Sequence, residues 1–172
     1  MDKQTVYNEL PIKTDIFTIR KRVRGDLDEL SGWPPYPGPF QVFNFHLTTK
    51  DEKDKRFARY ESNPELIILS AEHPQNGLVG TFSLRDIEWA DMRIKNIGIR
   101  MHPDWCGKGH GSGILSGIVS WLSAMGFKSL RMDVSKENIR AVRAYEKAGF
   151  EITGEVKCGN NMHWLMEKSI QQ

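Results

Sequence analysis

Trp105-Cys-Gly-Lys-Gly-His-Gly-Ser-Gly113 places glycine at alternate positions from Gly107 onward, between an extended apolar segment and a long amphipathic one. Downstream, apolar residues recur at three- and four-residue spacing, which is typical of one face of a helix: Ile114, Leu115, Ile118, Val119, Leu122 and Met125. The first turn of a helix has N–H donors without partners and about half a positive charge. The run therefore predicts a glycine loop at a helix N-terminus that binds an anion such as phosphate.

The spacing of the glycines excludes two common phosphate loops. A P-loop requires Ser or Thr after Gly-Lys, and here Gly109 follows Lys108. The dinucleotide fingerprint G-x-G-x-x-G also fails, because Ser112 or Ile114 stands where its last glycine is required. What remains is G-x-G-x-G after an apolar strand.

An alternating segment, Asn96-Ile-Gly-Ile-Arg-Met101, precedes the glycines and predicts a half-buried strand that ends before Pro103. Gly98 inside it indicates a bulge or a close backbone approach. A strand that splays from its neighbour exposes N–H and C=O groups to a ligand with amides. Coenzyme A, with its pyrophosphate and its pantetheine amides, fits both the loop and the strand. The expected cofactor contacts on this basis are Ile99, Arg100, Met101, Gly107, Lys108, Gly109, His110, Gly111 and Ser112.

Residues 97–150 resemble the core motif pair of the GNAT superfamily of acyl-CoA-dependent N-acyltransferases. The cofactor loop of that family has Gln or Arg, two variable residues, Gly, one variable residue, and Gly or Ala. Its next helix has Asn, then Tyr seven residues later, then Gly-Phe. The matching residues here are Gly109 and Gly111 in the loop, and Asn138, Tyr145 and Gly149-Phe150 in the helix. Cys106 departs from the motif, since it stands where the family has Gln or Arg.

The order of patterns along the chain predicts a mixed α/β sheet. Strands are expected near 17–21, 66–69, 78–84, 93–101, 130–134, 150–156 and 162–166, and helices from the glycines to Met125 and over 139–148. Residues 25–30 and 51–61 read as helical or irregular. Asn76-Gly77 predicts a hairpin turn. The resemblance implies a single GNAT-like domain over 1–172, with a mostly antiparallel sheet flanked by helices and a splay at the cofactor site.

Composition fits one compact domain, with 172 residues of which 39% are apolar. Lys and Arg number 24 against 22 Asp and Glu, so the charge balance gives no reason to expect nucleic acid. Residues 1–10 lack an apolar signal region and no run reaches membrane-spanning length, so a cytoplasmic protein is expected. Cys106 and Cys158 are too few for a disulfide framework or a zinc site, which predicts free thiols and no metal.

The resemblance implies chemistry for two residues of the second motif. In GNAT enzymes with this motif the Asn contacts the pantetheine arm and the Tyr protonates the leaving thiolate, which points to Asn138 and Tyr145. Two helical turns separate them, roughly 10 Å along the axis. The structural alternatives are that Asn138 is a helix N-cap and Tyr145 a core aromatic.

The expected reaction is transfer of an acetyl group from acetyl-CoA to a primary amine, on a small molecule or a protein N-terminus, by direct attack through a tetrahedral intermediate. The alternative is a non-catalytic acyl-CoA-binding or sensor domain of the same fold. A homodimer is left open.

A general base is not evident in the sequence. Asn96 stands where some GNAT branches carry Glu, and Asn cannot accept a proton. The remaining candidates are Asp133, Glu88, Asp86 and His46, along with a water chain or an amine that arrives neutral.

Charged and aromatic residues suggest the two ends of the site. Lys108, His110, Arg140 and Arg143 carry or can gain the positive charge that phosphates require, the two arginines for the 3′-phosphate, although a solvated helix face explains the arginines equally well. The rigid aromatic loop over 32–40 could wall the acceptor site or pack on the core. Asp86, Glu88 and Asp91 would suit a cationic amine, or an exposed turn.

Overall fold

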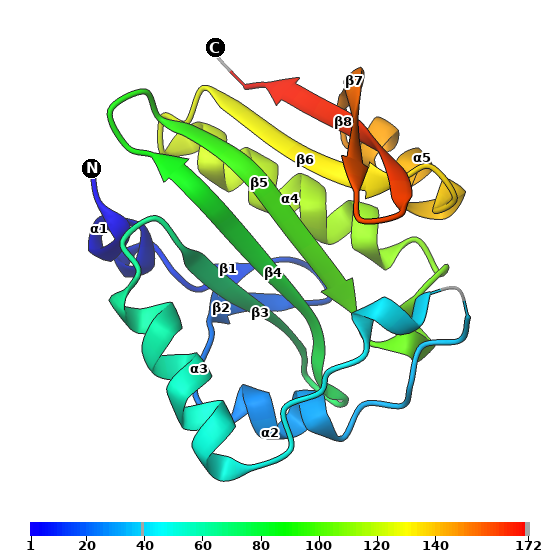
Figure 1. The fold of residues 1–172 in the computed structure, drawn as a ribbon. Coiled ribbons are helices and arrows are strands. Elements are labelled where there is room, and N and C mark those ends of the chain that lie inside the picture. Colours follow the sequence, from blue (N-terminus) through cyan, green and yellow to red (C-terminus); the bar gives the residue numbers. More distant parts are fainter. Residues whose placement is uncertain (39, 171–172) are drawn as a thin grey trace.

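A computed structural model of the chain describes residues 1–38 and 40–170 (Figure 1). Its helices are α1 (Lys3–Asn8), α2 (Asp26–Ser31), α3 (Lys50–Ser62), α4 (His110–Ala124) and α5 (Ile139–Lys147), with 3-10 turns η1 (Phe40–Phe43) and η2 (Pro103–Trp105). Its strands are β1 (Ile12–Lys13), β2 (Thr18–Lys21), β3 (Ile67–His73), β4 (Gly77–Glu88), β5 (Arg93–Met101), β6 (Ser129–Ser135), β7 (Glu151–Cys158) and β8 (Asn161–Ser169).

The eight strands form one sheet in the order β1-β2-β3-β4-β5-β6-β8-β7. Every neighbouring pair is antiparallel except β5 and β6, which are parallel. This confirms the predicted mixed, mostly antiparallel sheet. The predicted hairpin joins β3 to β4, where Gly77 has a φ of +66°, which favours glycine.

The parallel pair separates soon after it begins. β5 and β6 are paired only at Arg93 with Ser129 and at Ile94 with Leu130. Beyond Ile94, β5 keeps its ladder to β4 as far as Met101, while β6 turns away toward β8. Figure 1 shows the two strands diverging toward the N-terminus of α4. We call this opening the wedge; it is the splay that the sequence predicts, and it leaves backbone groups of β5 without a ladder partner.

The predicted apolar face of α4 is the centre of the core. Ile114, Leu115, Ile118, Val119 and Leu122 are all buried, and they pack in one cluster with the sheet. Burying a side chain of this size contributes about 1.5–3 kcal/mol. In Figure 1, α4 lies behind β5 and β6. The main core therefore fixes the helix whose N-terminus faces the wedge.

A second, smaller apolar cluster holds the segment between β2 and β3. Leu27 and Leu30 of α2 pack on Leu78 at the start of β4, with Trp33, Phe45, Phe57 and Tyr60 around them. In Figure 1, the chain between α2 and α3 passes in front of β3 and β4. The described part of this chain, residues 32–38 and 40–49, is called the α2–α3 segment below.

One helix was not predicted from the sequence, and one sequence expectation needs correction. The pattern did not reveal α1, a helix of only six residues that Asp2 caps by accepting from the Thr5 N–H and that buries Val6. Gly98 is not a bulge, because the register between β4 and β5 runs through it without a shift. The alternative of a close approach holds: a Cβ at Gly98 would lie 2.5 Å from Ser83 Oγ.

Within the described residues, no helix has the length and apolar character needed to cross a membrane.

Candidate active site

The glycine loop forms the N-terminus of α4 at the open end of the wedge. Gly107 and Gly109 have φ values of +76° and +84°, a backbone conformation that side chains with a Cβ rarely adopt. Gly109 is the N-cap and provides no side-chain hydrogen bond, whereas Ser112 Oγ donates to the Gly109 carbonyl at 2.9 Å. The first N–H groups of α4 therefore have no intrahelical acceptor and remain available to an anion.

One of the predicted phosphate partners lies against this loop. A Cβ at Gly107 would lie 3.2 Å from Arg140 Nη1, so the absence of a side chain makes room for that guanidinium. The Arg140 guanidinium carbon is also 5.7 Å from the Phe40 ring centre. Lys108 and Arg143 are exposed. Arg140, at the start of α5, is thus positioned to add positive charge beside the loop.

The side chain of His110 packs in an aromatic cluster and does not contribute to the predicted phosphate site. Its ring packs at 5.0 Å from the Trp105 ring and 5.6 Å from the Phe17 ring, in an aromatic cluster that also includes His73. The backbone N–H of His110 stays in the first turn of α4. Any contact of this residue with an anion would therefore come from its main chain.

The strand side of the wedge is formed by Ile99, Arg100 and Met101. Tyr36 donates its hydroxyl hydrogen to the Met101 carbonyl, which ties the α2–α3 segment to the end of β5. The Cys106 thiol lies 3.7 Å from the same carbonyl oxygen, and burial raises the pKa of this thiol. Cys106 is therefore a protonated structural residue rather than a nucleophile.

Asn138 and Tyr145, the two residues of the second motif, have the structural roles that the sequence analysis gave as alternatives, a helix N-cap and a core aromatic. Asn138 is the N-cap of α5, and its Oδ1 accepts from the Ala141 N–H at 3.3 Å. Tyr145 packs on the main core, with its ring centre 6.5 Å from that of Phe150. Burial, and then the charge of Asp133, raise the pKa of Tyr145 to about 12. Its phenol therefore holds its proton at neutral pH and is able to donate it.

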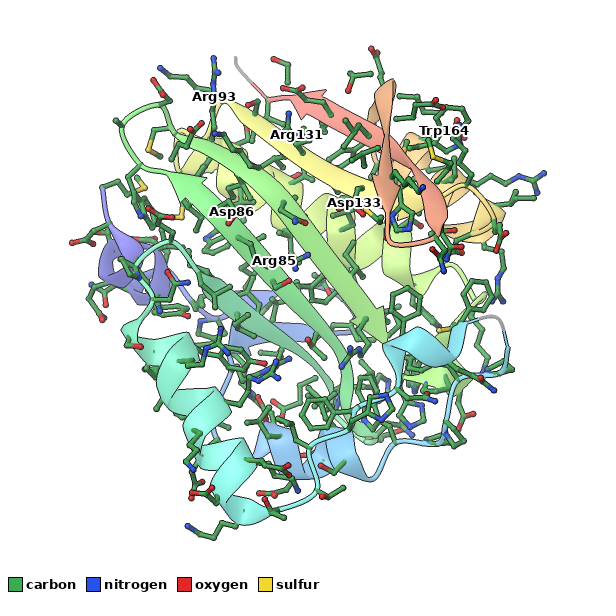
Figure 2. All side chains as sticks on the ribbon, in the orientation of Figure 1. Arg85, Asp86, Arg93, Arg131, Asp133 and Trp164 are labelled. Atoms are coloured by element: carbon green, nitrogen blue, oxygen red, sulfur yellow. The ribbon has the colours of Figure 1, made fainter. Side chains whose placement is uncertain are left out.

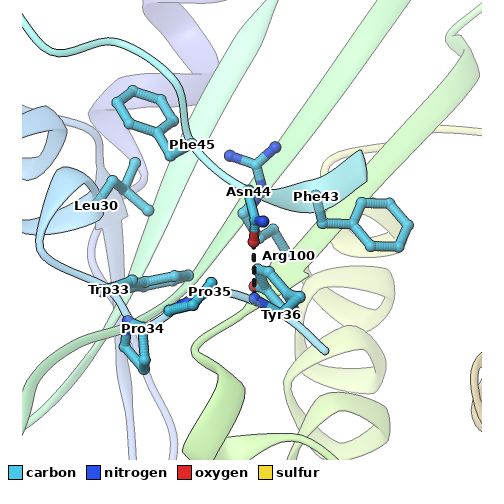
Figure 3. Close-up of a pocket in the computed structure, with 9 residues that line it drawn as sticks. All are labelled: Leu30, Trp33, Pro34, Pro35, Tyr36, Phe43, Asn44, Phe45 and Arg100. Carbon is cyan, nitrogen blue, oxygen red and sulfur yellow. Dashed lines mark hydrogen bonds between the residues drawn. The ribbon is translucent and has the colours of Figure 1, made fainter. Parts of the chain in front are cut away.

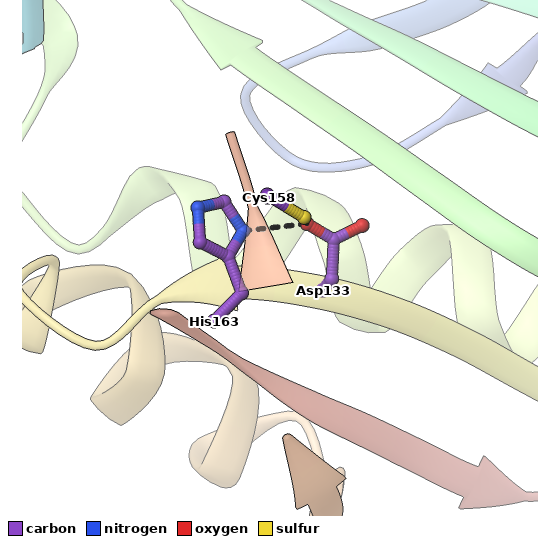
Figure 4. Close-up of side chains that lie close together, drawn as sticks. All are labelled: Asp133, Cys158 and His163. Carbon is purple, nitrogen blue, oxygen red and sulfur yellow. Dashed lines mark hydrogen bonds and ion pairs between the residues drawn. The ribbon is translucent and has the colours of Figure 1, made fainter. Parts of the chain in front are cut away.

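A polar group made by Asp133, Cys158 and His163 lies on β6, β7 and β8 (Figure 4), and the charge of its Asp133 acts on the Tyr145 phenol. His163 Nδ1 is 2.7 Å from Asp133 Oδ2, and the Cys158 thiol is 3.9 Å from the same oxygen. Figure 2 places Asp133 on the near face of the sheet, on the β6 side of the wedge. A carboxylate that accepts from Nδ1 leaves Nε2 of the imidazole free to accept a proton. The sequence drew attention to Asp133 but missed His163.

Asp133, Cys158 and His163 are also metal ligands by type, with ligand atoms within 4.8 Å of one another. One observation favours a hydrogen-bonded group over a metal site. The Asp133–His163 contact already has the length of a charge-assisted hydrogen bond.

The other base candidates are engaged or remote. Asn96 Oδ1 accepts from Arg85 Nη2 at 2.8 Å, and Glu88 forms an ion pair with Lys95 at 2.5 Å. Asp86 is exposed with a positive φ of 55°, and His46 is exposed in the α2–α3 segment. Among the predicted candidates, Asp133 is the one whose charge acts on Tyr145.

Residues 33–36 of the aromatic loop predicted over 32–40 line a pocket beside the end of β5 (Figure 3). Residue 39 of that loop lies outside the described residues. The pocket has a volume of about 110 Å³ and is lined by Leu30, Trp33, Pro34, Pro35, Tyr36, Phe43, Asn44, Phe45 and Arg100. We call it the arginine pocket. Trp89, by contrast, packs against Phe127 with a ring separation of 6.1 Å and is a core residue.

Comparison with known proteins identifies the fold. A family model described as an acetyltransferase (GNAT) domain matches residues 17–151. The chain belongs to the GNAT acetyltransferase family. As a GNAT acetyltransferase it transfers an acetyl group from acetyl-CoA to an amine, which confirms the predicted enzyme class and co-substrate. The wedge and the glycine-capped helix fit a cofactor with amides and a pyrophosphate.

Relatives of this acetyltransferase agree. An uncharacterised N-acetyltransferase of Mycobacterium bovis is 27% identical over 121 residues, which are 70% of this chain and 74% of that protein. An uncharacterised protein of Methanocaldococcus jannaschii is 26% identical over 171 residues; the match covers 96% of this chain but only 34% of that protein.

Solved structures share the fold at lower identity. A chimera of the spermidine N-acetyltransferase from Vibrio cholerae has a TM-score of 0.78 at 19% identity, covering 91% of this chain and 96% of that one. The Vibrio cholerae enzyme in complex with CoA and spermine has a TM-score of 0.72 at 18% identity, with the same coverage.

Proposed function

We propose that the wedge and the glycine loop bind acetyl-CoA and that Tyr145 protonates the departing thiolate. The observation that carries the proposal is the position of the α4 N-terminus at the open end of the parallel β5–β6 pair. The N–H groups of Gly107 to Ser112, with Arg140 beside them, would hold the pyrophosphate. The exposed edge of β5 at Ile99 to Met101 would bind the pantetheine amides, and Asn138 would contact the same arm.

In the proposed reaction, each bond that forms is matched by one that breaks, and residues of this chain donate and accept the protons. The neutral amine nitrogen attacks the thioester carbonyl, so a C–N bond forms and the C–S bond breaks. Tyr145 gives its proton to the leaving sulfur, and the amide product loses one proton. The raised pKa of Tyr145 keeps this acid protonated before each turnover.

We further propose that His163 accepts the proton from the amine. Asp133 would hold the imidazole with Nε2 free and stabilise the imidazolium that forms, because it accepts from Nδ1 at 2.7 Å. Asp133 then acts as a positioning residue. This assignment supplies the base that Asn96 cannot provide.

Tyr145→Phe distinguishes a catalytic acetyltransferase from a non-catalytic acyl-CoA-binding or sensor domain. We expect kcat to fall by about 10²–10⁴-fold with acetyl-CoA affinity unchanged, because the phenol acts only on the leaving group. The measurement is release of free thiol from acetyl-CoA with a panel of amines, together with titration of coenzyme A. Cofactor binding without turnover of any amine, in both the wild type and the variant, would support the sensor domain instead.

For the oligomeric state and the acceptor of this chain, we propose only a general class. A dodecamer is known for the Vibrio cholerae spermidine enzyme, and self-association of this chain, as a homodimer or larger, is in line with it. The single domain over 1–172 and the cytoplasmic location stay predictions. The acceptor is a primary amine, and its chemical class is argued next.

A further inference from the structure

Two arginines, Arg22 and Arg100, form no ion pair with a carboxylate among the described residues. Arg22 follows β2, and Arg100 lies near the end of β5. Charged side chains are almost never fully buried unless they are paired, because leaving water costs several kcal/mol per ion. Arginines held in this way indicate a site for a negatively charged ligand.

Arg22 is the more deeply buried of the two, with an exposed fraction of 5%. Its Nε and Nη2 atoms have no hydrogen-bond partner among the described residues, and its guanidinium carbon lies 5.8 Å from the Tyr60 ring centre. The nearby carboxylate of Asp26 is occupied, since it accepts two bonds of 2.9 Å from Arg20. Burial lowers the pKa of Arg22 and the charge of Arg100 lowers it further, whereas Tyr60 and the charge of Asp26 act in the opposite direction.

Arg100 lines the arginine pocket. Burial lowers its pKa, and the charged and titratable groups that act on it are Tyr36, Tyr60 and Arg56, none of which is a carboxylate. Its guanidinium carbon lies 5.9 Å from the Phe45 ring centre. The five N–H donors of a guanidinium lie in one planar fork, which matches the geometry of a planar oxyanion.

The pocket around Arg100 is small and its wall is fixed. The Tyr36 N–H donates to Asn44 Oδ1 at 2.7 Å, which closes the α2–α3 segment on itself (Figure 3). About 10–15 Å³ of pocket space holds one water, so a volume of about 110 Å³ has room for a carboxylate or a phosphate group.

The pocket adjoins the proposed transfer site. Arg100 belongs to the part of β5 that faces the wedge, and the segment that walls the pocket continues to Phe40, which contacts Arg140 beside the glycine loop. An acceptor anchored here would have its other end near the wedge.

We propose that the acceptor is an amine that also carries an anionic oxyacid group, a carboxylate or a phosphate, and that Arg100 binds this group in the arginine pocket, with the buried charge of Arg22 nearby. The proposal rests on the proposed acetyltransferase function and names its substrate class. A polyamine such as spermidine, the acceptor of the structurally similar Vibrio cholerae enzyme, would place its cations against the half-buried Arg100 and near the buried Arg22. Glu88, one of the three acids that suggested a cationic acceptor, is paired with Lys95.

Matched amines test the proposal. Glycine, β-alanine and γ-aminobutyrate are each compared with their carboxamides, phosphoethanolamine with ethanolamine, and spermidine is assayed alone. We expect kcat/KM to be at least about tenfold higher for the anionic member of one or more pairs, since a charge-assisted bond exceeds a neutral one. Preference for a carboxylate or for a phosphate identifies the group. Spermidine or the carboxamides as the better substrates would overturn the proposal.

Arg100→Gln should reduce the ratio between anionic and neutral amines toward one, and Arg100→Lys should restore part of it. The matched control is Arg93→Gln, which removes an exposed arginine from the other end of β5 and should leave the ratio unchanged. A ratio that survives in Arg100→Gln, or that falls equally in Arg93→Gln, would refute the assignment of the pocket.

A measurement of anion binding in the absence of turnover tests the arginine pocket independently of the proposed acetyltransferase activity. With coenzyme A at saturation, inorganic phosphate should raise the Tm of the wild type more than sodium chloride of equal ionic strength, and should not do so in Arg100→Gln. Equal shifts in both proteins would count against the pocket. If no amine is acetylated but the shift is specific to the wild type, the acetyltransferase proposal fails and the anion site stands.

Discussion

At the scale of single residues, the two proposed proton carriers differ in how they are held. Tyr145 keeps its proton because burial raises its pKa to about 12, so its environment makes it an acid. His163 depends on a partner, Asp133, that fixes which ring nitrogen is free. Tyr145 could be assigned from its motif, whereas His163 could not, because its partner is 30 residues away in the sequence.

The base assignment predicts a distinctive pH dependence. His163→Gln should lower kcat by about 10²–10⁴-fold at neutral pH, with the loss shrinking as pH rises and the amine becomes neutral in solution. Asp133→Asn should cause a smaller loss in the same direction, because it removes only the positioning of the ring. Kinetics between neutral and alkaline pH check this.

Cys158→Ser is the control for that prediction, since Cys158 contacts the same carboxylate but is not proposed to accept the proton of the amine. It should retain the pH profile of the wild type. A His163→Gln enzyme whose rate deficit is the same at every pH would show that His163 has only a structural role.

At the scale of elements, the site depends on where α4 begins and where β5 and β6 part. The apolar face of α4 could be read from spacing alone, and the helix begins at His110 as the glycines suggest. The separation after Ile94 has a different origin, because β6 pairs with β8 along its whole length and only briefly with β5. The helix is a local property, and the wedge results from competition between strands.

Gly109→Asp should weaken coenzyme A binding by more than about tenfold, measured by titration calorimetry. A Cβ at Gly109 would meet no atom within 4 Å, so the protein itself has room. The losses come instead from the φ of +84°, which costs a non-glycine residue about 1–3 kcal/mol, and from negative charge beside the pyrophosphate.

Gly113→Asp provides the matched control, because it adds the same charge one turn further along α4, where a Cβ is also in open space and φ is not positive. It should change the affinity much less. Equal affinities for Gly109→Asp and the wild type would disprove the loop assignment.

At the scale of the whole molecule, Asp26 joins three elements that lie far apart in the sequence. It is 1% exposed at the start of α2, and it accepts from Arg20 of β2 and from Ser70 of β3, the latter at 2.7 Å. Burial alone would raise the pKa of Asp26, but these hydrogen bonds outweigh it and leave the pKa below its usual range. The network holds α2, and with it the α2–α3 segment, against the sheet.

Asp26→Asn should lower the free energy of unfolding by about 3–5 kcal/mol at pH 7, because it leaves Arg20 partly unpaired. The lowered pKa means that the carboxylate stabilises the fold above the unfolded value near pH 4, and that this contribution disappears as pH falls through the folded value. Urea unfolding at pH 7 and pH 3 measures both effects.

The acid dependence should be weaker in Asp26→Asn than in the wild type. Asp51→Asn, which breaks an exposed pair between Asp51 and Lys55, should behave as the wild type does. Equal losses of stability in the two variants would show that the Asp26 network does not have the role given to it.

The amino-acid sequence by itself determined most elements, the hairpin at Asn76-Gly77, the glycine loop and the family, because spacing, turn residues and motifs are encoded within a few consecutive residues. Only the tertiary structure decided that Asp133 meets His163 and that the charge of Arg100 acts on the buried Arg22. Those contacts follow from strand order and register. The free energy that sets them is distributed over the whole sheet, and no local stretch of sequence contains it.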